Sequence, residues 1–234
     1  MHKLKPVLYS TGFFRRESLL RGALFDLDGT LVNTLSDLAY AMNRSLRIHG
    51  LVPYETDAYR YMVGNGIDIL THRAVGEHKE LFDEVKHTYA SYYSEHWHDR
   101  SEPYPGIMEL LNYLKKQNMK LCVFSNKPHL DTCHVIRHYF GDDLFDEIQG
   151  QTARIPIKPD PAGAIELAER LGVSPEEMLY FGDSGVDMQC AKNAGMKAVG
   201  VLWGFRERQE LMDNGADLLI EKPQDMITLL SGKE

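Results

Sequence analysis

Short apolar segments that alternate with helical segments constrain the fold of this chain more than any other feature. Segments rich in Val, Ile, Leu and Phe are typical of buried strands and lie at 22–26, 120–125, 147–150, 178–182, 198–203 and 217–220. Most are separated by helical patterns, among them 106–118, 160–172 and 186–195. Strands linked in this way form a parallel sheet with helices on both faces. The sequence therefore predicts an α/β fold with a Rossmann-like core.

One connection is much longer than the others. More than 90 residues separate the strand at 22–26 from the strand at 120–125, whereas a crossover needs about a dozen or more. The helical segment 106–118 provides that crossover. The remaining residues, roughly 35–102, contain helical patterns and no convincing strand. We therefore predict a small helical domain inserted after the first strand.

The predicted organisation is an extension at 1–20, an α/β core at 21–34 and 103–234, and a helical cap at 35–102. Pro103, Pro105 and Gly106 suit a hinge where the cap rejoins the core. The extension carries more basic than acidic residues and has no clean apolar region of a signal peptide. We expect it to lie on the surface or to be disordered.

Composition and charge limit the possible functions. The formal net charge of -8 argues against a general nucleic-acid binder, which usually carries a basic face. No apolar run approaches the roughly 20 residues of a membrane span. The three cysteines are widely spaced and form no C-x-x-C pattern, which predicts a reduced, cytoplasmic setting. The sequence thus favours chemistry on a small molecule, and leaves both a monomer and a homodimer open.

The stretch GALFDLDGTLVNT places two carboxylates, Asp26 and Asp28, directly after a buried strand. A charge at such a place is costly unless it is compensated. One interpretation is a turn, because Asp-Gly is common turn chemistry, or a helix cap at Asp26. The other is a site, because Ser125 and Asp183 also follow strands, and the carboxyl ends of parallel strands share one edge of the sheet. A cap that leaves from this edge would act as a lid.

These side chains suit phosphoryl transfer. Asp26 and Asp183, with backbone carbonyls and water, make an all-oxygen site for Mg²⁺. Asp26 can then attack phosphorus, because carboxylates form acyl-phosphate intermediates, while Asp28 exchanges a proton with the leaving oxygen and with water. Side chains that could bind the phosphoryl oxygens are Thr30, Ser125 and Lys158. Asn126 either joins them or orients its neighbours.

Four motifs in order, DLDGT, a strand-end SN, KPDP and GDSGVD, resemble those of the haloacid dehalogenase (HAD) superfamily. The inserted cap is similar to the helical C1 cap of that superfamily. The resemblance implies that Asp26 is the nucleophile and Asp28 the general acid and base, with Mg²⁺ held by Asp26, the backbone carbonyl of Asp28 and Asp183. It also implies that Ser125 and Lys158 bind the phosphoryl group. Asp187 would support the metal or Lys158, although it could instead only cap the helix that follows.

Several stretches, among them VGNGIDILTHRA, FSNKP and GDSGVDMQCAKNAG, resemble phosphoglycolate phosphatases more closely. This resemblance implies a phosphatase acting on a small phosphorylated metabolite such as 2-phosphoglycolate. The loop of Gly64, Asn65 and Gly66 could approach a small substrate closely, or be an ordinary helix connection. Arg73 could bind a substrate carboxylate, or belong to a solvated helix face. Asn33 stands where an Asp is usual in the family.

Other functions stay open. A pyrophosphatase or nucleotidase, or a sugar-phosphate phosphatase or mutase with the same type of cap, would have a similar core. Such mutases tend to carry a His soon after the first motif and an Arg just beyond the cap-loop glycine, whereas here 33–40 reads NTLSDLAY and Ile67 follows Gly66. Both features favour hydrolysis. A phosphorylated signalling domain would need neither Asp28 nor a lid, and an inactive scaffold would not need every motif residue.

Overall fold

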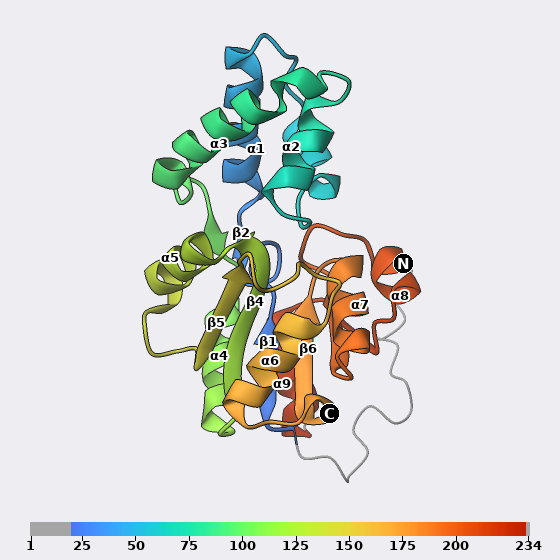
Figure 1. Cartoon of the computed structure of the whole chain (residues 1–234). Coiled ribbons are helices and arrows are strands. Elements are labelled where there is room, and N and C mark those ends of the chain that lie inside the picture. Colours follow the sequence, from blue (N-terminus) through green and yellow to red (C-terminus); the bar gives the residue numbers. More distant parts are fainter. Residues whose placement is uncertain (1–19, 233–234) are drawn as a thin grey trace, which may run out of the picture.

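The computed structural model describes residues 20–232, so the predicted extension lies outside the described residues apart from Leu20. Its centre is a sheet with the strand order β5-β4-β1-β6-β7-β8 (Figure 1). Every neighbouring pair of strands in this sheet is parallel. The strands are β1 (Gly22–Phe25), β4 (Lys120–Pro128), β5 (Glu147–Gln151), β6 (Met178–Gly182), β7 (Lys197–Val201) and β8 (Leu218–Ile220). The predicted α/β fold is confirmed.

Strand β1 shows why helices cover both faces of the sheet. All four of its residues are buried, and successive side chains of a strand point to opposite faces. Ala23 and Phe25 pack in one apolar layer and Leu24 in another. The first layer includes side chains of α4 (Ile107–Lys116), α5 (His129–Phe140) and α9 (Pro223–Ser231), and the second those of α6 (Ala162–Leu171), α7 (Gly185–Asn193) and α8 (Arg208–Asp213). A strand buried on both faces needs a continuous apolar run, as GALF is.

Strand β1 also lies where the strand order reverses. The chain passes from β1 to β4 and β5 on one side, and returns to β6, β7 and β8 on the other. Ligands of such sheets bind beyond the carboxyl ends of the strands at this reversal. The carboxyl ends of β1, β4 and β6 are therefore where a site is expected.

Helices α1 (Leu35–Ile48), α2 (Ile67–Val75) and α3 (Phe82–His96) form a bundle beyond this edge of the sheet (Figure 1). Short 3₁₀ helices at Thr56–Tyr61 and Lys79–Leu81 connect them. The bundle has its own apolar cluster, which includes Leu46, Tyr59 and Val85. We propose that residues 35–102 are a cap domain, and that 21–34 and 103–234 are the core domain.

The two chain segments that connect the core and the cap are hydrogen-bonded to each other. Two-residue strands, β2 (Val32–Asn33) and β3 (Glu102–Pro103), pair antiparallel. Beside them the buried carboxylate of Asp37 accepts hydrogen bonds from the backbone N–H groups of Arg100 and Ser101 at 2.9 and 2.8 Å and from the Ser101 hydroxyl at 2.7 Å. The sequence predicted no strand here, because two residues are too few to show a strand period.

Within residues 20–232, none of the helices has the length and apolar character that crossing a membrane requires.

Candidate active site

Asp26 extends β1 beyond the edge of the sheet. Its N–H donates to the carbonyl of Phe181 at 2.9 Å, and the chain then turns back through 27–32. Within the turn Gly29 has a φ of 94°, and a Cβ at this residue would collide with the Asp183 carboxylate. Only glycine fits both conditions. The Asp-Gly pair thus lies in a turn, in which the N–H groups of Thr30, Leu31 and Val32 donate to the carbonyl of Leu27.

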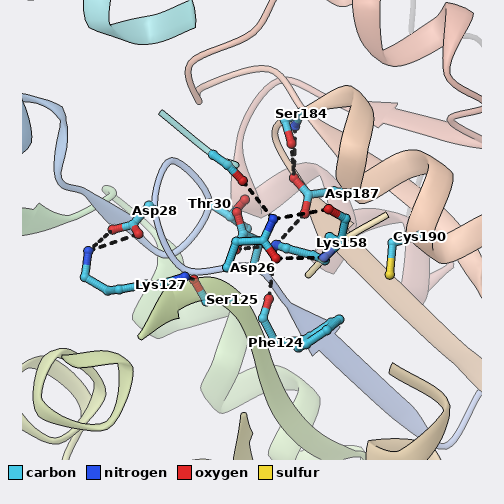
Figure 2. A network of polar contacts seen from close by, with 12 residues as sticks. Asp26, Asp28, Thr30, Phe124, Ser125, Lys127, Lys158, Ser184, Asp187 and Cys190 are labelled. Atoms are coloured by element: carbon cyan, nitrogen blue, oxygen red, sulfur yellow. Dashed lines mark hydrogen bonds and ion pairs between the residues drawn. The ribbon is translucent and has the colours of Figure 1, made fainter. Parts of the chain in front are cut away.

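Lys158 joins two of the predicted carboxylates. Its Nζ donates to Oδ1 of Asp26 and to Oδ1 of Asp187, each at 2.7 Å, and to the carbonyl of Phe124 at 3.2 Å (Figure 2). The side chain is 2% exposed. Burial alone would lower the pKa of Lys158, but the carboxylates of Asp187 and Asp26 outweigh it and raise that pKa above its ordinary value. The ammonium therefore stays charged in the interior.

Asp187 lies in the first turn of α7. Its Oδ1 binds Lys158, and its Oδ2 accepts hydrogen bonds from the N–H and the hydroxyl of Ser184 at 3.1 and 2.5 Å. The sequence left open whether Asp187 supports Lys158 or caps the helix. In the structure one carboxylate makes both contacts.

Asp183 follows β6 and is 2% exposed. Its Oδ2 accepts the N–H of Phe205 at 2.7 Å, and its Oδ1 lies 3.5 Å from the hydroxyl of Thr30. Burial and the negative charge of Asp187 raise the pKa of Asp183 to about 7. Burial and the Asp187 charge also raise the pKa of Asp26 well above its ordinary range, against the opposing effect of Lys158. The site holds more negative charge than its own cation neutralises.

This cluster fits a divalent cation. Carboxylate oxygens of Asp26, Asp183 and Asp187 all lie within 4.8 Å of one another, and Lys158 is the ammonium paired with two of them. Three carboxylates and one ammonium leave two negative charges, and an all-oxygen donor set is what Mg²⁺ prefers. Both carboxylate oxygens of Asp187 accept hydrogen bonds, from Lys158 and from Ser184, whereas Lys158 contacts only Oδ1 of Asp26. Asp26 and Asp183 are therefore the better placed carboxylates to hold the ion.

A cavity of about 300 Å³ lies in front of Asp26, between core and cap. Its polar walls come mainly from the core residues Asp26, Asp28, Ser125, Asn126 and Lys127. Its apolar walls come from the cap residues Leu38, Val63, Ile67, Leu70, Tyr89, Ala90 and Tyr93. Ligand cavities span roughly 300–1,000 Å³, so this cavity has room for a small substrate.

The predicted residues at the end of β4 contribute in different ways. The Ser125 hydroxyl lines the cavity and accepts the N–H of Lys127 at 3.2 Å. The Asn126 amide accepts the N–H of Lys158 at 2.8 Å and donates to the carbonyl of Gly64 in the cap at 3.0 Å. Asn126 therefore holds Lys158 and the cap loop in place, as one of its two interpretations expected.

The predicted cap residues separate into two pairs. Gly64 and Gly66 line the cavity, with φ values of 102° and 84°. Asn65 and Arg73 are not among the lining residues and bind each other instead, with the Arg73 guanidinium 3.0 Å from the Asn65 amide oxygen. The same Arg73 nitrogen donates to two backbone carbonyls of 61–62 at 3.1 and 2.9 Å. Arg73 thus shapes the cap loop.

Lys127 is a site residue that the sequence analysis missed. Its Nζ lies 3.0 and 3.1 Å from the two carboxylate oxygens of Asp28 (Figure 2). Burial alone would lower the pKa of Lys127, but the Asp28 carboxylate raises it above its ordinary value. The hydroxyl of Thr34 also donates to Asp28, at 2.7 Å. The signal was present, because Lys127 comes shortly after the apolar run 121–124, as Asp26 comes after the apolar run 23–25.

The loop at 203–206 was also missed, and it fastens the cap to the core. The guanidinium of Arg60, in the cap, donates to the carbonyls of Phe205 and Gly204 at 2.9 and 3.1 Å. In return Arg206 donates to the carbonyl of Val63 at 3.0 Å. Phe205 packs into the apolar cluster of the cap while its N–H binds Asp183. Contacts between backbone and distant side chains leave no periodic pattern in a sequence.

Comparisons with known proteins find relatives over most of the chain. Residues 23–201 match the family described as haloacid dehalogenase-like hydrolase. A phosphoglycolate phosphatase of Mannheimia succiniciproducens is 35% identical over 88% of this chain and 96% of its own length. One of Pseudomonas putida is 31% identical over 92% of this chain and 80% of its own length.

A solved structure from Haemophilus somnus, described as a predicted phosphoglycolate phosphatase, superposes with a TM-score of 0.84 at 31% identity. The match covers 90% of this chain and 98% of that one. The resemblance drawn from the four sequence motifs is confirmed. The chain belongs to the haloacid dehalogenase-like hydrolase family and is an enzyme of that family.

Proposed function

We propose that this hydrolase is a Mg²⁺-dependent phosphatase that cleaves a small phosphomonoester through a phosphorylated Asp26. The observation that carries the proposal is the cluster in which Lys158 binds Asp26 and Asp187, next to Asp183, beside a cavity that also contains Asp28. The names of the relatives suggest 2-phosphoglycolate as the substrate. The cavity of about 300 Å³ favours such a small ester over a nucleotide.

Each charged side chain of the cluster has a task in binding the phosphate. Asp26 and Asp183 would hold the metal, together with the backbone carbonyl of Asp28. When bound, Mg²⁺ would neutralise charge on the phosphoryl oxygens and bring them against Asp26. Lys158 keeps the Asp26 carboxylate oriented at 2.7 Å and adds a positive charge. The Ser125 hydroxyl, on the cavity wall, would donate to a phosphoryl oxygen.

The reaction then proceeds in two steps. An Asp26 oxygen forms a bond to phosphorus while the bond from phosphorus to the ester oxygen breaks, and Asp28 gives its proton to that oxygen. Water next attacks the phosphorus of the aspartyl phosphate and passes a proton to Asp28. Phosphate leaves and the Asp26 carboxylate is restored. The cap, seated on the core through Asn126 and Arg206, would keep other water away from the first step.

A phosphate-release assay over a panel of esters tests the proposed function. The panel contains 2-phosphoglycolate, sugar phosphates, nucleoside monophosphates and pyrophosphate, each with Mg²⁺ and with EDTA. We expect 2-phosphoglycolate to give the highest kcat/KM. A higher kcat/KM for a nucleotide or for pyrophosphate would change the proposed substrate but not the proposed reaction. No Mg²⁺-dependent release from any ester would refute a phosphatase. The monomeric or dimeric state and the cytoplasmic setting stay predictions.

Asp28→Asn tests the role of Asp28 through the leaving group. On 2-phosphoglycolate, which releases a poor alkoxide leaving group, we expect kcat to fall by about 10²–10⁴-fold, the usual contribution of general acid–base catalysis. On 4-nitrophenyl phosphate the loss should be smaller, since nitrophenolate leaves without a proton. Thr34→Val removes only the 2.7 Å hydrogen bond to Asp28 and should show a weaker form of the same pattern. Equal losses on both esters would remove Asp28 from this role.

A further inference from the structure

The buried Lys127 places a positive charge inside the substrate cavity. Its side chain is 5% exposed, and β4 brings it there because this strand continues to Pro128, past Val123, the residue that pairs with the last residue of β1. Among the described residues that line the cavity, Lys127 alone is cationic at neutral pH. Lys158, the other lysine of the site, is committed to Asp26 and Asp187.

A second polar group in the same cavity is without a partner. Tyr93 lines the cavity from α3, and the Lys127 ammonium lies 4.9 Å from the centre of its ring. The Tyr93 hydroxyl is buried and has no hydrogen-bond partner among the described residues. Burial and the nearby Asp28 charge raise the pKa of Tyr93 well above its ordinary value, so the hydroxyl keeps its proton. A buried donor without an acceptor is costly, which indicates that a ligand supplies the acceptor.

The positive charge of Lys127 favours an anion beside it, although the carboxylates of Asp28 and Asp131 also line the cavity. Leu38, Val63, Ile67 and Leu70 form apolar walls of the cavity, and charge pairs are stronger where water is excluded. Lys127 already binds both oxygens of one carboxylate, that of Asp28, at 3.0 and 3.1 Å. A substrate carboxylate has the same shape and charge, and could replace it.

We propose that Lys127 and Tyr93 form a subsite for a carboxylate on the leaving group of the substrate. In the substrate complex this carboxylate takes the place of Asp28 at the Lys127 ammonium and accepts a hydrogen bond from Tyr93. Asp28 faces the leaving oxygen in the proposed reaction, so a carboxylate one carbon beyond that oxygen reaches the neighbouring Lys127. The exchange releases Asp28 to turn toward the leaving oxygen. This proposal rests on the proposed phosphatase function.

The experiment compares two esters of nearly identical shape, 2-phosphoglycolate and its amide, carbamoylmethyl phosphate. The quantity measured is the ratio of their kcat/KM values within each variant, so any general loss of activity cancels. We expect the wild type to prefer the carboxylate, and Lys127→Met to lower that preference about 10- to 100-fold, as expected for a lost charge-assisted hydrogen bond. Tyr93→Phe should lower it about 2- to 10-fold, as for a neutral hydrogen bond.

Two controls accompany these variants. Lys192→Met removes a half-exposed lysine in the last turn of α7 that pairs with Asp217 at 2.7 Å, and should leave both rates and the preference unchanged. Lys127→Arg keeps the charge and should retain most of the preference.

The outcomes separate the two proposals. A preference unchanged in Lys127→Met, or absent from the wild type while both esters are hydrolysed, overturns the subsite and leaves the phosphatase intact. If Lys127→Met is unfolded or inactive on both esters, Tyr93→Phe decides, and an unchanged preference in that variant overturns the subsite. Absence of Mg²⁺-dependent phosphate release from every ester refutes the phosphatase itself.

Discussion

Asp26→Asn is expected to abolish turnover with every phosphate ester. The asparagine amide has nearly the same shape as the carboxylate but is not nucleophilic enough to form an acyl phosphate. Loss of a nucleophile lowers kcat by about 10⁶-fold in a well-studied hydrolase, and here we expect activity at the level of the uncatalysed reaction. The measurement is phosphate release from 2-phosphoglycolate and from 4-nitrophenyl phosphate. The aryl ester matters because its good leaving group cannot rescue a missing nucleophile.

Stability distinguishes this effect from misfolding. Burial and the negative charges of Asp187 and Asp183 raise the pKa of Asp26, so a neutral amide at this position avoids both a buried charge and repulsion. The melting temperature of Asp26→Asn should therefore not fall. Asp68→Asn, at an exposed ion pair with Lys86 in the cap, is the matched control and should keep full activity. Wild-type enzyme quenched during turnover should carry a phosphoryl group on Asp26. Substantial turnover by Asp26→Asn would contradict the covalent mechanism.

Removal of Mg²⁺ should have an effect of similar size. EDTA is expected to reduce phosphate release to background, and Mg²⁺ in excess to restore it, because Asp26 and Asp183 alone leave the phosphate facing uncompensated negative charge. The same ion should raise the melting temperature, since a ligand that binds only the folded state stabilises it. Asp183→Asn should weaken both effects. Unchanged turnover in EDTA would exclude the proposed metal site.

The metal effect should also depend on pH, with a sign that follows from Asp183. Its pKa is about 7 in the folded chain and about 3.9 in an unfolded one. Between these values the folded state holds the proton more tightly, so the contribution of Asp183 to the stability of the metal-free chain is greatest below about pH 4 and falls as pH rises through 7. Mg²⁺ needs the ionised carboxylate. The increase in melting temperature that Mg²⁺ causes should therefore be larger at pH 8 than at pH 5.5. An equal increase at both pH values would contradict the role of Asp183 as a metal ligand.

Strands β1 and β6 at the centre of the sheet were predictable because they are buried on both faces. Such a strand must be an apolar run, as GALF and MLYFG are, whatever lies around it. The additional helices between β1 and β4 were predictable from length, because the connection from residue 26 to residue 120 is much longer than one crossover needs. Asp26 and Asp183 follow β1 and β6, and Ser125 lies in the last part of β4. They converge because the carboxyl ends of neighbouring parallel strands lie at one edge of the sheet.

The cap side of the site was harder to predict. Asn65 and Arg73 had the right chemistry for a substrate, yet they bind each other and the cap backbone. Lys127 had a clear local signal, but its partner Asp28 lies 99 residues away in the chain. Nothing in the sequence pairs the two, because their contact depends on how far β4 extends past the end of β1.

The sequence by itself determined the order of the strands in the chain, the place of the insertion and the carboxylates at the strand ends. These properties follow from burial and from chain connectivity, which local patterns record. Only the tertiary structure decided which groups are paired: Lys158 with Asp26 and Asp187, Lys127 with Asp28, and the loop at 203–206 with the cap. Such pairs form between segments far apart in the chain. The local pattern of apolar and polar residues does not record which distant side chain or carbonyl each charged group contacts.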